Sequence, residues 1–256
     1  MLRAIAGAAS AMNAKQIKTD TIANNLANVN TTGYKKSRAD FAELVGQEFS
    51  SNGIPVAAGS QDQDMLTVGS GVKVSGITNN LRPGQLVETQ RPLDLAVFGE
   101  GFFKVVLPDG EERYTRDGTF SLDANGYMTT PSGYRLDGIE TPPGTVDITI
   151  AADGEISVND AGRITGAGQV KLYKFNSAAA LRAEGKNLFS AVGEAVEGIP
   201  GSQGFGAIKQ GCLEGSNVDF TEEMASLIEV QRAYNFSARI LRLADEMFGL
   251  ANNLRK

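Results

Sequence analysis

Histidine and cysteine often serve as bases, nucleophiles and metal ligands at neutral pH, and this chain nearly lacks both. It contains no histidine, and its one cysteine is Cys212. Without an imidazole partner, that thiol is a poor candidate for a catalytic nucleophile. One cysteine also excludes an intramolecular disulfide and a cysteine-rich zinc site. We therefore expect Cys212 to be structural.

The remaining patterns that could carry chemistry are incomplete. Gly166-Ala167-Gly168 and Gly204-Phe205-Gly206 begin a dinucleotide fingerprint that neither completes, and no serine lies in a G-x-S-x-G elbow. Asp123-Ala124-Asn125-Gly126 starts like a calcium loop but places its glycine too early. A pair of carboxylates joined by the fold stays open. We expect no catalysis, no cofactor and no metal, so the chain is not an enzyme.

Charge and hydropathy exclude two further classes. The net charge of −6 argues against nucleic-acid binding, which needs a clustered basic surface. No stretch approaches the roughly 18 apolar residues that cross a bilayer. Arg3 precedes a short segment ending in Ala9-Ser10-Ala11, but this is too short for a typical signal peptide. If the chain leaves the cytoplasm, we expect export without cleavage.

The first 30 residues predict a helix. They contain no proline and one glycine, Gly7, and small or apolar residues recur at Leu2, Ile5, Ala9 and Met12. The pattern is weaker further along this segment. Thr31-Thr32-Gly33 then forms a stop signal, with Gly33 placed to adopt the left-handed cap.

The last 40 residues predict a longer helix with a regular seam. Large residues recur every seven positions, at Phe220, Leu227, Tyr234, Leu241 and Phe248. Three positions after each of the last four lies a mostly small residue, namely Val230, Ser237, Ala244 and Ala251. This pattern is typical of a coiled coil. Asn217 or Asp219 can cap the helix. Each helical stripe either packs on its own β domain or pairs with the other helix and with neighbouring subunits.

Between the helical ends, the pattern changes to short alternating runs separated by turns. Strands are predicted at 93–98 and 102–107, and 30 glycines supply many turns. The predicted fold class is α+β, with terminal helices paired as a coiled coil around a mainly antiparallel β domain. The predicted domains are an N-terminal helix at 1–38, an extended or mixed arm at 39–90, a β-rich outer domain at 91–212 and a C-terminal helix at 213–256.

Asparagine is unusually dense near the end of the first helix. Four lie between positions 24 and 30, although asparagine is a poor helix former. Their amides either satisfy terminal carbonyls of a frayed helix end or hydrogen-bond across subunits and fix the register. The residues alone favour neither interpretation.

Four segments, in order along almost the whole chain, resemble the family of flagellar rod and hook proteins. ANNLANVNTTGYKKSRADF at 23–41 is similar to the family's N-terminal signature. PLDLAVFGEGFFKV at 92–105 and YTRDGTFSLDANGYMTT at 114–130 resemble its β motif. The segment at 210–241 is similar to its C-terminal signature. The chain length, NTTGYKKSRADF and LEGSNVDFTEEM resemble distal rod subunits most.

The resemblance implies a structural role in the basal body. Subunits would leave through the flagellar type III export apparatus without a cleaved signal and polymerise into a hollow helical drive shaft that spans the periplasm and transmits torque from motor to hook. Expected partners are further copies of the chain, proximal rod and hook subunits, and the peptidoglycan and outer-membrane ring proteins. The expected assembly interface comprises Leu2, Ile5, Met12, Asn24, Asn25, Leu26, Asn28, Val29, Phe220, Leu227, Val230, Tyr234, Leu241 and Phe248.

Two alternatives remain open. A proximal rod or hook subunit would share the same signatures and differ in its position along the axis. A secreted glycan-binding β module would be a stable monomer, but it leaves both terminal heptad patterns unexplained. The stretch from Ser50 to Asp64 matches the family pattern least, and its glycine, serine, glutamine and aspartate residues predict an extended or mobile arm.

Overall fold

The computed structural model describes residues 2–49, 66–139, 141, 147–160, 163–175, 177 and 180–253. The stretch from Ser50 to Asp64 therefore lies outside the described residues. The chain forms two compact units, and each contains segments that are distant in sequence. The helical unit comprises 1–24, 37–78 and 221–256, and the β unit comprises 25–36 and 79–220.

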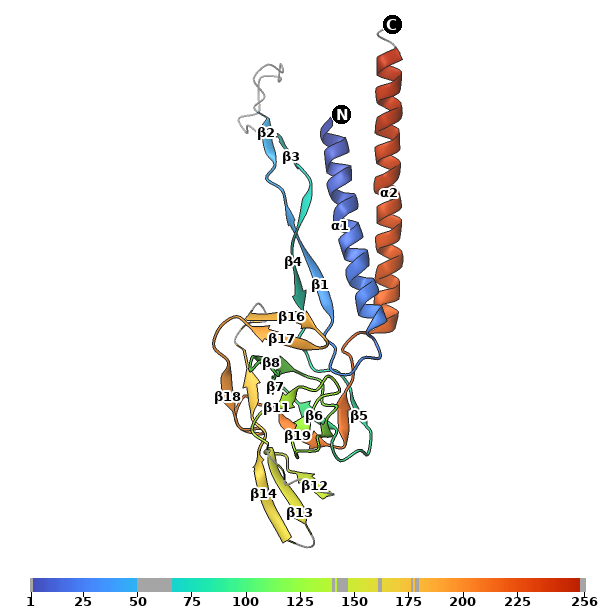
Figure 1. Cartoon of the computed structure of the whole chain (residues 1–256). Helices are drawn as coiled ribbons and strands as arrows, with labels where there is room; N and C mark the ends of the chain where they lie inside the picture. The colour runs from blue at the N-terminus through green and yellow to red at the C-terminus, as the bar shows by residue number, and fades with distance from the viewer. Residues whose placement is uncertain are drawn as a thin grey trace. The chain divides into compact units, whose positions relative to one another are not determined.

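The helical unit contains two long helices that pack side by side and run in opposite directions (Figure 1). They are α1 (Leu2–Ala27) and α2 (Phe220–Asn253). Neither contains proline, and Glu222 and Glu223 lie in the first turn of α2, where the helix dipole favours negative charge. The predicted α+β class with paired terminal helices is confirmed.

A narrow β ladder completes the helical unit. Its strands are β1 (Ser37–Glu43), β2 (Gln47–Phe49), β3 (Leu66–Val68) and β4 (Val72–Asn79). β1 pairs with β4, and β2 pairs with β3. The Val72 amide donates to the Ser10 hydroxyl of α1 at 3.4 Å, so the ladder contacts this helix directly.

The β unit is built from antiparallel sheets. Its largest sheet follows the order β16-β17-β8-β7-β11-β10-β9, with β15 joining β7 to β18. A second sheet has the order β12-β13-β14, and β19-β6 and β20-β5 form two-stranded ladders. The bounds are β5 (Leu86–Glu88), β6 (Leu95–Phe98), β7 (Phe102–Val106), β8 (Glu112–Thr115), β9 (Ser121–Leu122), β10 (Met128–Thr129), β11 (Arg135–Leu136), β12 (Asp147–Ile150), β13 (Glu155–Asp160), β14 (Arg163–Gln169), β15 (Leu172–Lys174), β16 (Leu181–Gly185), β17 (Leu188–Ala191), β18 (Val196–Gly198), β19 (Ala207–Gln210) and β20 (Cys212–Glu214).

The core of the β unit lies on both faces of β7. Phe103 and Val105 belong to the larger apolar cluster, whereas Phe102 belongs to a second, aromatic cluster. Because side chains alternate along a strand, the segment FFKVV fills both layers. Cys212 is also buried, as a free thiol. The domain boundaries after residues 38, 90 and 212 remain predictions.

Candidate assembly interface

The expected seam of α2 faces inward within the helical unit. Val230 and Ala244 are 1% and 3% exposed. Leu227, Tyr234, Ser237, Leu241 and Phe248 are half-buried, and the side chain of Ala251 lies outside the described part of the chain. Phe220, at the first position of the helix, is instead largely exposed. The heptad stripe is therefore the least exposed face of α2 from residue 227 to residue 248.

A second apolar stripe lies on the exposed surface of α2. Phe236 and Leu250 are each 66% exposed, and Leu243 is 58% exposed. The stripe comprises Ile228, Phe236, Ile240, Leu243, Met247 and Leu250. The last five are spaced by three or four residues, which places them on one helical face. The seven-residue repeat does not predict this stripe, because none of its residues occupies a seam position.

The face of α1 differs from its prediction in detail. Ile5, Met12 and Leu26 are half-buried. The fully buried apolar positions are instead Ala8, Ala14 and Ile22. The Leu2 backbone begins α1, but its side chain lies outside the described part of the chain. Ala8 and Ala14 are small, which allows close approach of neighbouring backbone, and neither falls at the positions of the predicted repeat.

The asparagine-rich segment makes contacts within its own chain. Asn25 is buried, and its Oδ1 accepts a hydrogen bond from the Tyr34 hydroxyl at 3.1 Å. Asn28 Oδ1 accepts from the Thr31 hydroxyl at 3.2 Å. Asn24 is exposed, and Val29 is half-buried. The side-chain amides of Asn25 and Asn28 therefore form hydrogen bonds within their own chain. A role of the segment in setting subunit register stays a prediction.

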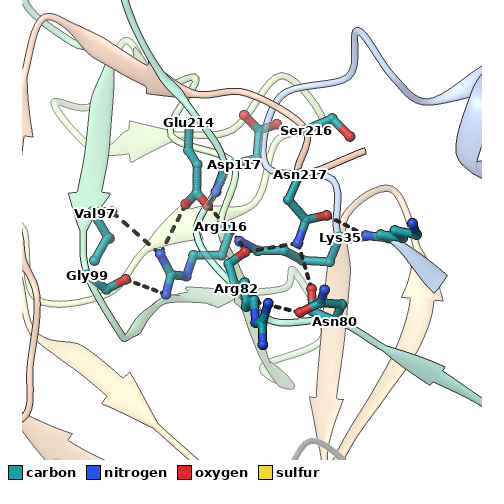
Figure 2. Close-up of polar contacts among 12 residues, drawn as sticks. Lys35, Asn80, Arg82, Val97, Gly99, Arg116, Asp117, Glu214, Ser216 and Asn217 are labelled. Carbon is teal, nitrogen blue, oxygen red and sulfur yellow. Dashed lines mark hydrogen bonds and ion pairs between the residues drawn. The ribbon is translucent and has the colours of Figure 1, made fainter. Parts of the chain in front are cut away.

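A buried ion cluster lies within the β unit, where Lys35, Arg116 and Glu214 meet (Figure 2). Glu214 Oε1 accepts from Lys35 Nζ at 2.6 Å, and Oε2 accepts from Arg116 Nη1 at 3.0 Å. The backbone amide of Gly84 also donates to Glu214 Oε1, at 2.8 Å. One carboxylate thus joins two cations and one amide that are distant in sequence.

Backbone groups satisfy much of the remaining hydrogen-bonding capacity of the ion cluster. Lys35 Nζ donates to the carbonyl of Arg82 at 2.9 Å, and Arg116 Nη2 donates to that of Gly99 at 2.9 Å. The Arg116 guanidinium also lies 5.0 Å from the centre of the Phe102 ring. Arg116 Nε is buried without a hydrogen-bond partner. Buried charges are retained in proteins when they are paired in this way.

Burial and charge oppose each other in this cluster. Desolvation lowers the pKa of Lys35, while the neighbouring Glu214 carboxylate acts in the opposite direction. The same two causes act on Arg116, and desolvation again dominates and lowers its pKa. The cluster contains two cations and one anion, so Glu214 is the group on which both cations depend.

Gly33 allows the N-terminal segment to pack against the β unit. Its φ of 67° lies in the left-handed region, and an added Cβ would lie 2.5 Å from the Asp117 amide nitrogen. Next to it, the Thr32 hydroxyl donates to Asp117 Oδ1 at 3.0 Å. The left-handed conformation was expected as a helix cap, but α1 already ends at Ala27. Gly33 instead permits close backbone approach.

Asn217 also has a different role from the predicted one. Its Oδ1 accepts from the Lys36 amide at 2.7 Å, and its Nδ2 donates to the carbonyls of Asn80 and Arg82 at 2.8 and 2.9 Å. The side chain therefore links its own segment to the segments at Lys36 and at Asn80–Arg82, and its amide is not used to cap α2. Asp219 is the residue that directly precedes the helix.

We use the term polar junction for Lys35, Arg116, Glu214 and Asn217. Sequence reasoning did not identify it as a site, although Lys35 and Glu214 lie inside the segments that carried the family resemblance. Among the described residues, no group of three histidine, cysteine or acidic side chains is arranged to hold a metal ion. Nor does any helix in the described ranges have the length and apolar character needed to span a membrane.

Three family models match the chain in order. They are the flagella basal body rod protein at residues 6–35, the flagellar hook protein FlgE/F/G D1 domain at 96–158 and the flagellar basal body rod FlgEFG protein C-terminal region at 209–254. Lys35, Arg116 and Glu214 each come from a different matched segment. The polar junction is therefore where these three segments meet.

Full-length relatives agree with these matches. The chain is 40% identical to the flagellar basal-body rod protein FlgG of Borreliella burgdorferi, with all of both chains covered. It is 38% identical to the protein of the same name in Agrobacterium fabrum, over 98% of each chain. It is also 33% identical, over the whole of both chains, to the flagellar hook-basal body complex protein FlhP of Bacillus subtilis. With identity at this level over its full length, the chain belongs to the FlgG family of flagellar basal-body rod proteins, which are structural subunits of the rod.

Proposed function

We propose that this chain polymerises into the distal rod, a hollow helical shaft that transmits torque from the motor to the hook. Family membership supports the rod itself. The observation that carries the polymerisation is the second apolar stripe of α2, which stays exposed although the helix already packs its seam inward. Contiguous exposed apolar surface of this kind marks an interaction site.

The energetics of the stripe favour assembly. Complete burial of one large aliphatic or aromatic side chain contributes about 1.5–3 kcal/mol, and the stripe offers such side chains on every subunit. Contacts that repeat head-to-tail without closing generate an open helical filament. Association then stabilises a helix that is otherwise partly unsupported in water.

The decisive experiment is the variant Leu243→Asp. Leu243 is 58% exposed, so the charge should leave the monomer folded while preventing burial of the stripe. We expect normal circular dichroism and a monomeric elution volume, but no motility when the variant replaces the wild-type gene. Electron microscopy of the basal bodies should show truncated rods without hooks.

Gln231→Asp is the matched control. Gln231 is exposed on the same helix, and it lies twelve residues before Leu243, roughly 120° away around the axis. It introduces the same charge outside the apolar stripe, so cells that carry it should swim. Full-length rods and normal motility with Leu243→Asp would refute the assignment of this face.

A sister axial protein is the second candidate. The full-length match to a hook-basal body complex protein favours it, because that relative carries a different name within the same architecture. Immunogold labelling of purified basal bodies separates the two. Label between the proximal rod and the hook supports the distal position, and label at either end supports a sister subunit.

Family membership implies a location in the flagellar basal body. We further propose that the chain contacts proximal rod subunits, hook subunits and the peptidoglycan and outer-membrane ring proteins across the periplasm. We propose export through the flagellar type III apparatus without cleavage, which N-terminal sequencing of assembled rods would test. We also propose that the role is mechanical and not enzymatic.

A further inference from the structure

The path of the chain makes the β unit a meeting point of several connections. Within the described residues, the chain passes between the helical unit and the β unit four times. The crossings lie between Asn24 and Asn25, Lys36 and Ser37, Thr78 and Asn79, and Phe220 and Thr221. Any force that passes from one unit to the other through the backbone must pass through these connections.

Asn217 joins the ends of three of these crossings inside the β unit. It lies three residues before the last crossing, and its Oδ1 accepts from the Lys36 amide at the second crossing, at 2.7 Å. Its Nδ2 donates to the carbonyl of Asn80, one residue beyond the third crossing, at 2.8 Å. The Asn80 amide in turn donates to the Lys36 carbonyl at 2.8 Å, so each contact supports the next.

The ion cluster connects the same segments to the rest of the β unit. Lys35 is next to the second crossing and also donates to the Arg82 carbonyl, which Asn217 contacts as well. Glu214 lies on β20 and links Lys35 to Arg116, whose guanidinium donates to the carbonyl of Gly99, directly after β6. The Tyr34 hydroxyl connects the first crossing by donating to Asn25. Figure 2 shows Lys35 and Arg116 gathered with Glu214 and Asn217.

We propose that Asn217 and the Lys35–Glu214–Arg116 ion cluster form a clamp that holds the crossings between the two units together as one cooperative element. The mechanical part of this inference rests on the proposed rod function. In a rotating shaft, crossings that are held together share the load, whereas unconnected crossings would be loaded and pulled open one at a time. Asn217 is then a positioning residue for force transmission and touches no ligand.

Amide hydrogen exchange on the full-length monomer tests the clamp directly. Asn217→Ala removes the acceptor of the Lys36 amide, so that amide should exchange faster whether or not the clamp exists. The clamp also predicts faster exchange at Asn80 and Gly84, whose amides donate to other groups. We expect acceleration of about tenfold or more at all three amides, since loss of roughly one hydrogen bond destabilises a local element by such a factor.

Two further variants sharpen this measurement. Asn217→Asp keeps an acceptor for the Lys36 amide but replaces the donor to the Asn80 and Arg82 carbonyls with a charged oxygen. Hydrogen exchange should therefore accelerate more at the Asn80 amide than at the Lys36 amide. Asn125→Ala removes an exposed asparagine whose Nδ2 reaches Asp123 in a turn, and it should leave the three clamp amides unchanged. Acceleration confined to Lys36 in Asn217→Ala would overturn the clamp.

Swimming under load tests the mechanical consequence. Cells with Asn217→Ala should assemble rods and swim in dilute buffer, but they should lose speed more steeply than wild type or Asn125→Ala as Ficoll raises the viscosity. Equal viscosity dependence in rod-bearing cells would refute force sharing. Failure of the proposed function is distinguishable, because the wild-type gene would then be dispensable for motility, whereas the exchange experiment needs only the monomer.

Discussion

Removing Glu214 should destabilise the β unit far more than removing one of the cations that it pairs. Glu214 and Lys35 side chains are 0% and 1% exposed, and the Arg116 side chain is 2% exposed. Glu214→Gln leaves two buried cations without their shared carboxylate. Removal of one partner from a buried pair typically costs about 3–5 kcal/mol, because the remaining charge is uncompensated. We expect a loss in this range.

Lys35→Met is the informative comparison. It removes one of the two cations and leaves Arg116 paired with Glu214, so the buried charges balance. Glu214 Oε1 still accepts from the Gly84 amide, and the methionine stem fills most of the lysine volume. We expect a cost of about 1–2 kcal/mol from the lost charged hydrogen bonds, partly offset because a charge is no longer desolvated.

Urea unfolding of the full-length monomer at neutral pH measures both free energies. Far-ultraviolet circular dichroism follows the whole chain, and tyrosine fluorescence reports mainly on the β unit, because five of the six tyrosines lie in it, including the buried Tyr114 and Tyr173. Glu112→Gln is the control, because this half-exposed partner of Lys104 should cost less than about 1 kcal/mol. If Lys35→Met were as costly as Glu214→Gln, the charge argument would be wrong.

Two further predictions concern the polar junction and its neighbourhood. Gly33→Ala should cost more than the roughly 1–2 kcal/mol of left-handed strain, since its Cβ would lie 2.5 Å from the Asp117 nitrogen. Gly110→Ala has a similarly positive φ of 88° with open space around the Cβ, so urea unfolding should show the strain alone; equal losses would contradict the packing argument. Burial lowers the pKa of Lys35 from 10.5, so the folded state binds fewer protons than the unfolded state at alkaline pH. The stability of wild type relative to Lys35→Met should therefore rise as the pH increases toward the unfolded-state pKa of 10.5, and a flat or falling difference would contradict this prediction.

The sequence alone predicted the elements whose signals are local. The seven-residue repeat from Leu227 to Phe248 predicted the inward face of α2, because helical periodicity follows from backbone geometry. The apolar run that follows the turn at Gly99-Glu100-Gly101 predicted a strand at 102–107, where β7 lies. The scarcity of histidine and cysteine disfavoured catalysis, and four motifs along the chain indicated the family.

Only the tertiary structure identified the polar junction. Lys35 and Glu214 are 179 positions apart, and isolated lysine and glutamate residues usually lie on the surface, so no local pattern predicts their burial. The sequence pattern predicted Asn217 as a possible helix cap because capping preference is local. Its side chain instead forms hydrogen bonds with the backbone of Lys36 and Asn80. The second stripe of α2 was present in the sequence, but only packing decided which of two apolar faces stays exposed. Long-range partners compete with local preferences, and their outcome depends on how the whole chain folds.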